Sequence, residues 1–246
     1  MSHKTTTHPF RARFDAMVAK LREHPRIEVF EVVVGPPASA ADIRLAEEAV
    51  GATMPAEIRA FYEAHDGVFL EWGLRDETYE RTRPFGHPDD DHPPGCINIL
   101  PIRQAMSPSW ERDSHVNEIQ PAHQELLFGA PLDPSPKVAA VCVDNYARYH
   151  HGDLVFGPDP VMVVSTDYGA DMDSSDFASF AVYLDMTLAL FGIDRYEYGL
   201  GIGWTRSPAR VDAWTRTFEL DKLLARLDGD VEEEEEANED EAASDD

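Results

Sequence analysis

The stretch GPPASAADIRLAEEAVGATMPAEIRAFYEAHDGVFLEWGL, from Gly35 to Leu74, decides the fold. Ser39 stands three residues before Asp42, a capping pattern that predicts the start of a helix, and Gly51 is typical of a helix end. Pro55 favours the first turn of a second helix. The apolar residues of that helix recur at the spacing of one buried stripe, formed by Ile58, Phe61, Tyr62 and His65. We therefore expect two short helices joined by a tight corner.

A turn and an extended segment follow the second helix. Asp66 and Gly67 are typical of a turn, and the apolar residues from Val68 onward predict a strand. Runs of β-branched and apolar residues predict further strands over 27–34, 96–102, 138–144, 154–156 and 161–164. We expect the last three to be joined by tight turns, one at His-Gly-Asp (151–153) and one at Gly-Pro (157–158).

Helical periodicity extends beyond the opening stretch. Apolar residues recur from Phe10 to Leu21 and predict an N-terminal helix. A later helix is expected from Ser174 or Ser175 to Phe191, and further helices around 110–119 and from Pro208 to Leu227. Residues 76–95 lack periodicity, so we expect a long loop there; loops of this length inside a domain are usually functional or mobile.

These elements predict an α+β fold with a single domain. Its mixed or antiparallel sheet of five to six strands is flanked by helices and followed by a C-terminal helix extension. We place the globular domain at 1–228, with a core at about 27–192 and the helical extension at 194–228. The remainder, 229–246, contains eleven Asp or Glu and no Lys or Arg, so we expect an acidic disordered tail.

The chain has a formal net charge of −26 at pH 7. Without the eleven acids of the tail that charge is still −15, so the folded part is acidic as well. Such a protein repels nucleic acid and anionic membranes and attracts basic partners. Acidity also keeps a protein soluble, and charge alone does not choose between these two uses.

Cysteine usage and the N-terminus bear on the compartment. Cys96 and Cys142 stand in apolar surroundings without a pairing motif or zinc spacing, which predicts buried, reduced thiols. The N-terminal residues lack the apolar core of a signal peptide, and no apolar run reaches membrane-spanning length. We expect a soluble, cytoplasmic protein.

The stretch 35–74 resembles the SUKH superfamily, which comprises fungal regulators of cell-wall synthesis and many bacterial immunity proteins. The family pattern has Leu-Pro where this chain has Met54-Pro55, and often Asn-Gly where it has Asp66-Gly67. The resemblance rests on these two pairs and on Pro36-Pro37, Glu47, Gly51 and the aromatic pair Phe61-Tyr62. The detailed motif covers about forty residues, and the order of elements matches as far as Phe191.

The resemblance implies a SUKH-like domain and, as function, an immunity protein that binds and neutralises a cognate toxin. Many toxins neutralised by this family are nucleases, whose clefts must be basic to hold phosphate. The acidic charge fits such a basic protein partner. A regulatory scaffold of the same fold is the alternative, and a long acidic tail fits that role better than it fits a pure inhibitor.

The sequence contains no catalytic constellation, and we expect no cofactor. It has neither a G-x-S-x-G motif nor a cysteine with a histidine partner in a plausible context. The loop from His87 to His92 and the pair His150-His151 hold residue types that bind divalent metals, so a metal-dependent enzyme is a second alternative. The loop is rich in proline, and neighbours in an extended chain face opposite ways. We therefore expect no metal site.

Two stretches combine acids with an aromatic residue and are candidate partner-binding surfaces. Aromatic residues anchor interfaces, and acids set approach rate and partner choice. The first stretch contains Glu71, Trp72, Asp76 and Glu77, and the second contains Asp167, Tyr168, Asp171 and Asp173. Alternatively, Trp72 is a core residue of its strand, and the second stretch is a helix start whose acids favour the helix dipole.

Overall fold

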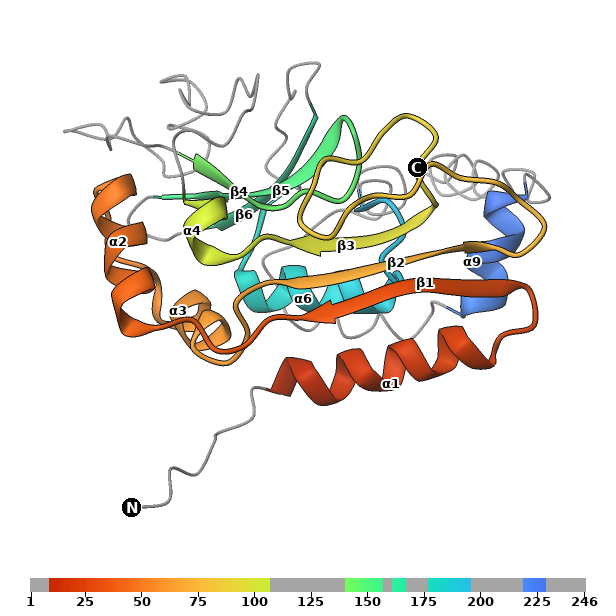
Figure 1. Cartoon of the computed structure of the whole chain (residues 1–246), viewed down its shortest axis with the longest axis horizontal. Helices are drawn as coiled ribbons and strands as arrows, with labels where there is room; N and C mark the ends of the chain where they lie inside the picture. Colours follow the sequence, from red (N-terminus) through yellow and green to blue (C-terminus); the bar gives the residue numbers. More distant parts are fainter. Residues whose placement is uncertain (1–8, 107–139, 157–160, 167–176, 196–218, 229–246) are drawn as a thin grey trace, which may run out of the picture.

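The computed structural model describes residues 9–106, 140–156, 161–166, 177–195 and 219–228. Its strands form one antiparallel sheet in which spatial order follows chain order (Figure 1). The strands are β1 (Ile27–Val34), β2 (Val68–Leu74), β3 (Gly95–Ile99), β4 (Ala140–Asp144), β5 (His150–Val155), β6 (Val161–Thr166) and β7 (Phe177–Ala178). The predicted α+β class is confirmed; six strands have five residues or more, and β7 adds a two-residue seventh.

Six helices flank this sheet within the described ranges. They are α1 (Pro9–Glu23), α2 (Ala40–Val50), α3 (Ala56–Tyr62), α4 (Ile102–Ala105), α6 (Phe180–Ala189) and α9 (Leu220–Leu227). In Figure 1, α1 lies below β1, and α6, which contacts α1, is seen behind β1 and β2. Helices α2 and α3 lie at one end of the molecule and α9 at the other. Across these ranges, no helix combines the length and apolar character needed to span a membrane.

The predicted helix pair and its corner are confirmed. The Ser39 hydroxyl accepts a hydrogen bond from the Asp42 N–H and caps α2, which ends at Gly51 with a left-handed φ of 74°. The Glu47 carboxylate then accepts a hydrogen bond from Met54 N at 2.8 Å and pairs with Arg59 of α3. One carboxylate from α2 therefore fixes the start of the next helix.

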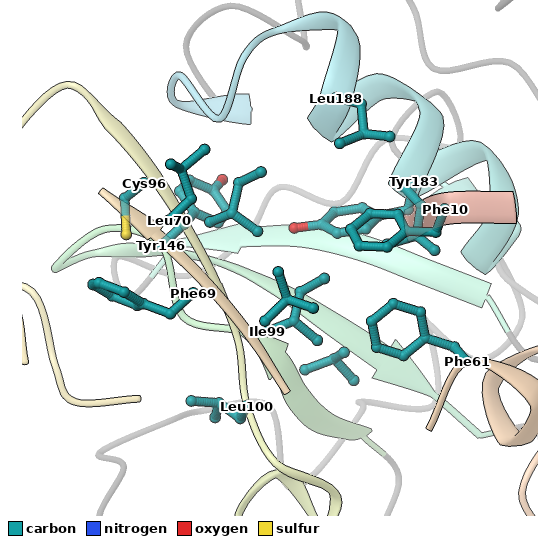
Figure 2. Packing of buried hydrophobic residues seen from close by; sticks show 14 of the residues in the cluster. Phe10, Phe61, Phe69, Leu70, Cys96, Ile99, Leu100, Tyr146, Tyr183 and Leu188 are labelled. Atoms are coloured by element: carbon teal, nitrogen blue, oxygen red, sulfur yellow. The ribbon is translucent and has the colours of Figure 1, made fainter. Parts of the chain in front are cut away.

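The hydrophobic core is continuous through the described helices and strands (Figure 2). The ring of Phe61 in α3 makes edge contacts with Phe10 of α1 at 5.3 Å and Phe180 of α6 at 5.4 Å between centroids. Leu223 and Leu224 of α9 are buried in the same cluster. Helix α9 of the C-terminal extension therefore packs on the main domain.

The buried state of both cysteines is also confirmed. Cys96 and Cys142 are each about 2% exposed or less. Burial raises the pKa of the Cys96 thiol well above its ordinary value, so it stays protonated and unreactive.

Two predicted element bounds are wrong. In each case a helix starts at a position that the apolar pattern of the sequence did not indicate. The strand predicted over 96–102 ends at Ile99, since Pro101 caps α4 with Ile102 as its first residue. The helix predicted from Ser174 or Ser175 starts only after Ser179, whose hydroxyl accepts from Val182 N. Phe177 and Ala178 instead pair with β6 as β7.

The predicted turn at 151–153 is wrong as well. His150 and His151 open β5, and they pair with Thr166 and Ser165 of β6. The connection between β4 and β5 lies earlier in the chain than predicted, at 145–149. Pairing with a neighbouring strand therefore outweighs the turn-like composition of His-Gly-Asp. The helix predicted around 110–119, residues 208–218 of the helix predicted from Pro208 to Leu227, and the acidic tail lie outside the described residues.

Candidate functional site

The first predicted contact stretch begins in a strand that is buried along its whole length. Glu71 and Trp72 of β2 are both 0% exposed. The Trp72 indole N–H donates to the carbonyl oxygen of Phe191 at 2.7 Å, which ties β2 to the end of α6. The prediction that Glu71 and Trp72 form a contact surface is therefore wrong, because an interior strand is covered on both faces. The alternative, that Trp72 belongs to the core, is confirmed.

The remaining predicted contact residues have different outcomes. Asp76 and Glu77 are exposed and open the connection between β2 and β3. This connection, residues 75–94, has neither helix nor strand, as predicted, and is called the acidic loop below. Asp167, Tyr168, Asp171 and Asp173 lie outside the described residues, so their role stays a prediction.

The buried carboxylate of Glu71 anchors the acidic loop from inside. Its Oε1 accepts a hydrogen bond from the backbone N–H of Thr82 at 2.7 Å, and its Oε2 accepts from Arg81 Nε at 3.1 Å. The Arg81 guanidinium also lies 4.3 Å above the ring centre of Phe30 in β1. Sequence reasoning missed this anchor because an acid beside a tryptophan is more typical of a surface.

A second anchor holds the middle of the loop. Asn98 of β3 donates through Nδ2 to the carbonyl oxygen of Gly86 at 2.8 Å, and Gln104 of α4 donates to that of Phe85 at 2.7 Å. Phe85 has a positive φ of 62° and packs its ring against Phe69. A left-handed backbone costs a non-glycine residue roughly 1–2 kcal/mol, so these contacts hold the loop in one conformation.

The two ends of the loop are fixed by polar contacts. The Tyr79 hydroxyl donates to Glu77 Oε2 at 2.7 Å and accepts from Leu74 N at 3.3 Å. Burial, with the Glu77 hydrogen bond, raises the pKa of Tyr79 to about 12, so the hydroxyl remains a donor at neutral pH. At the other end, Asp90 pairs with Arg148, which lies between β4 and β5.

The outer side of the acidic loop carries most of its charge. Six exposed acids and three exposed arginines give the loop a net charge of −3. Two of the arginines are held by hydrogen bonds, Arg75 to the carbonyl oxygen of Pro25 and Arg81 to Glu71. The exposed acids are Asp76, Glu77, Glu80, Asp89, Asp90 and Asp91. The loop therefore presents a negative surface on a backbone that the sheet holds in place.

Three histidines of the metal-site alternative have hydrogen-bond partners of their own. His87 Nδ1 accepts from Asn145 Nδ2 at 3.2 Å, and His92 Nδ1 donates to the carbonyl oxygen of Pro93 at 2.7 Å. His150 Nδ1 lies 2.6 Å from Asp194 Oδ2. The described part of the chain contains no group of three or more His, Cys, Asp or Glu arranged to hold a metal.

No protein-family model matches the chain, and no curated protein matches its sequence. The proposal on function therefore rests on the acidic loop and on the resemblance carried by residues 35–74.

Replacing Glu71 with Ala is expected to release the acidic loop. The Thr82 N–H would lose its acceptor, and a buried donor left without a partner costs about 1–3 kcal/mol. Hydrogen exchange followed by mass spectrometry should show the Thr82 amide exchanging about tenfold faster or more, since each 1.4 kcal/mol is a factor of ten. The exposed Asp76→Ala variant is the control and should leave that amide unchanged. Equal protection of Thr82 in both variants would contradict the anchoring role of Glu71.

Proposed function

We propose that this protein is a non-enzymatic binding protein that neutralises a cognate toxin, in the manner of a bacterial immunity protein. The observation that carries the proposal is the acidic loop, whose six exposed acids stand on a backbone anchored by Glu71, Asn98 and Gln104. The SUKH resemblance of residues 35–74 supplies the biological role.

A fixed acidic surface suits rapid inhibition of a basic protein. Ordering a flexible loop at an interface costs free energy. A loop that is already anchored loses little further conformational freedom when the partner binds. Complementary charge also accelerates encounter, by roughly 10- to 1,000-fold at low salt. A nuclease cleft is positive because it holds phosphate, so it is the kind of toxin surface that this loop fits best.

The contacts made by residues of the SUKH-like pattern support the resemblance. Glu47 joins the residue before Pro55 to the preceding helix, and Gly51 supplies the left-handed turn between them. Asp66 accepts a hydrogen bond from the Ile102 N–H at 2.8 Å and so links the turn before β2 to the start of α4. These positions determine how the helix pair meets the sheet, which gives a physical reason for the pattern.

The proposal is tested by using the full chain as bait in a lysate of its host that expresses candidate toxins. Bound proteins are identified by mass spectrometry after washes of increasing salt. We expect one tightly bound basic protein whose affinity falls as salt rises. Several weak partners of mixed charge would favour the regulatory scaffold instead. Recovery of a metal-dependent activity from the purified protein would favour the enzyme alternative.

Reversing charge on the acidic loop is expected to slow association with the recovered partner. The Asp89→Lys, Asp91→Lys double variant changes the local charge by four units and should lower the association rate constant about tenfold or more at low salt. The effect should shrink at high salt, where exposed charges are screened. Biolayer interferometry with immobilised partner measures both rates.

The matched control is the Glu48→Lys, Glu63→Lys double variant, which makes the same charge change at exposed positions in α2 and directly after α3. It should leave most of the association rate in place. An equal loss of rate in the two double variants would show that overall charge, and not the acidic loop, guides the partner.

A further inference from the structure

Helix α1 and the residues after it are basic in an otherwise acidic protein. Residues 11–26 contain five basic and two acidic residues, a net charge of +3 in a chain whose net charge is −26. Lys20 and Arg22 stand in the last turn of α1, where the helix dipole favours cations. Both are exposed, and within the described ranges neither has an ion-pair partner. This concentration of positive charge would attract an anionic ligand or segment.

A surface groove of about 330 Å³ runs between α1 and α6 beside these cations. Arg13 and Lys20 line one side, and Arg13 pairs with Asp185 of α6 across the groove. The apolar part of its lining comes from Met17, Leu188 and Phe191. The two cations against one acid leave the lining with a net positive charge.

The acidic tail of the same chain begins close to this groove. Helix α9 lies at the C-terminal end of α1 (Figure 1), where His24 Nε2 meets Asp221 Oδ1 at 2.9 Å. Arg26 donates to Asp228 Oδ1 at 2.7 Å and lowers the pKa of that carboxyl. The last eighteen residues, 229–246, therefore start next to the basic end of α1 and carry eleven acids without a single base.

We propose that the groove between α1 and α6 binds the acidic tail of its own chain, with Arg13 and Lys20 of its lining, and Arg22 beyond it in the last turn of α1, as the receiving cations. An extended chain of eighteen residues reaches roughly 60 Å, whereas the fifteen residues of α1 span only about 22 Å. The run of five glutamates at 232–236 is the closest acidic segment and lies within reach of Lys20. Exposed ion pairs are individually weak, but the short tether gives the tail a millimolar effective concentration at the groove.

If the tail covers α1, the described surface would be negatively charged there as well as at the acidic loop. With α1 covered, nucleic acid and anionic membranes would find no basic groove, while a basic partner would still meet the acidic loop. Because the tail attracts basic proteins too, a partner that captures it would uncover α1. This inference concerns a surface other than the acidic loop, so either proposal can fail without the other.

Zero-length cross-linking of the full-length protein tests the contact. A carbodiimide joins a lysine amine to a carboxylate that touches it, and the chain has few lysines, so products are simple to assign by mass spectrometry. We expect Lys20 to be joined to residues 230–246 at low salt, with at least a fivefold loss of this product in 1 M salt. The exposed pair Lys222–Glu219, at 3.6 Å, is the internal control for the chemistry.

Two outcomes of the cross-linking would overturn the proposal. Formation of the Lys222–Glu219 product without any Lys20–tail product would show that the tail does not occupy the groove. In a mixture of isotope-labelled and unlabelled protein, Lys20–tail products found only between copies would assign the groove to the tail of a second copy.

Energy transfer gives a second, independent readout. Cys96 and Cys142 are buried, so dyes will attach to introduced cysteines at the exposed Ala12 of α1 and at Ser244 of the tail. The Lys20→Glu, Arg22→Glu double variant should lose at least half of the transfer efficiency. The Arg44→Glu, Arg103→Glu variant makes the same charge change at exposed positions in α2 and α4 and should retain it. Equal losses in both variants would overturn the assignment to α1.

Discussion

The Arg195→Ala variant is expected to lose about 3–5 kcal/mol of the free energy of unfolding, because it leaves a buried carboxylate without its cation. Arg195 and Asp144 are both 0% exposed, and Nη2 of the arginine donates to Oδ2 of the aspartate at 2.8 Å. An isolated charge of this kind is among the few single changes that can unfold a domain of ordinary stability.

The partners of this pair explain why no other group can replace the arginine. Asp144 also accepts hydrogen bonds from the Tyr183 hydroxyl at 2.7 Å and from Asn98 N at 2.8 Å, but both donors are neutral. Arg195 donates further to the carbonyl oxygen of Cys96 at 2.6 Å and lies 4.1 Å above the ring centre of Tyr146. A methyl group in its place would leave acceptors and a carboxylate unpaired in the core.

Burial by itself would lower the pKa of Arg195, but the charge of Asp144 outweighs burial and raises that pKa above its ordinary value. The guanidinium is therefore charged at any pH at which the protein is folded. The ion pair cannot be removed by raising the pH in the neutral range, and only substitution tests it.

Urea unfolding followed by fluorescence measures the loss. The exposed pair Arg11–Asp15 supplies the control, since its side chains are 40% and 54% exposed and Arg11→Ala should cost less than about 1 kcal/mol. An Arg195→Met, Asp144→Leu double variant should recover part of the stability, because two apolar side chains leave no charge buried. A cost below about 1 kcal/mol for Arg195→Ala would show that the pair contributes little to the fold.

Local features of this fold could be predicted from the sequence, and features that depend on distant residues could not. The Ser39 cap, the Gly51 end and the two-helix corner depend on residues within a few positions of one another, and all three are confirmed. The strand at His150-His151 depends on Thr166 and Ser165 of β6, sixteen and fourteen residues further along the chain, whereas the local composition indicated a turn. Pairing energy overrides local preference in such cases.

The candidate site shows the same division. The long loop after β2 and the exposure of Asp76 and Glu77 follow from composition, as predicted. The burial of Glu71 does not follow from composition. Its carboxylate accepts hydrogen bonds from Thr82 and Arg81, which are eleven and ten residues away. A charged residue in a fully buried strand is unusual and is tolerated only when it is paired. From sequence alone, the partner that makes burial possible cannot be identified.

The Trp72→Ala variant is expected to cost about 3–5 kcal/mol of the free energy of unfolding, as large-to-small changes of buried aromatic residues do. Trp72 is 0% exposed and donates its indole N–H to Phe191 O. The exposed Leu45→Ala variant on α2 is the control and should stay within about 0.5 kcal/mol of the parent. A surface tryptophan that binds a partner would behave in the opposite way, with stability kept and affinity lost.

Gly95 makes the test of Trp72 specific. The two residues are cross-strand partners, and a Cβ at Gly95 would lie only 2.0 Å from the indole ring. The Phe191 hydrogen bond prevents the ring from moving aside, so Gly95→Ala alone should cost roughly 1–3 kcal/mol through overpacking. In the Trp72→Ala background the new methyl group enters the cavity left by the indole, and its cost should vanish or change sign. A coupling free energy near zero in this double-mutant cycle would contradict the packing of Trp72 over Gly95.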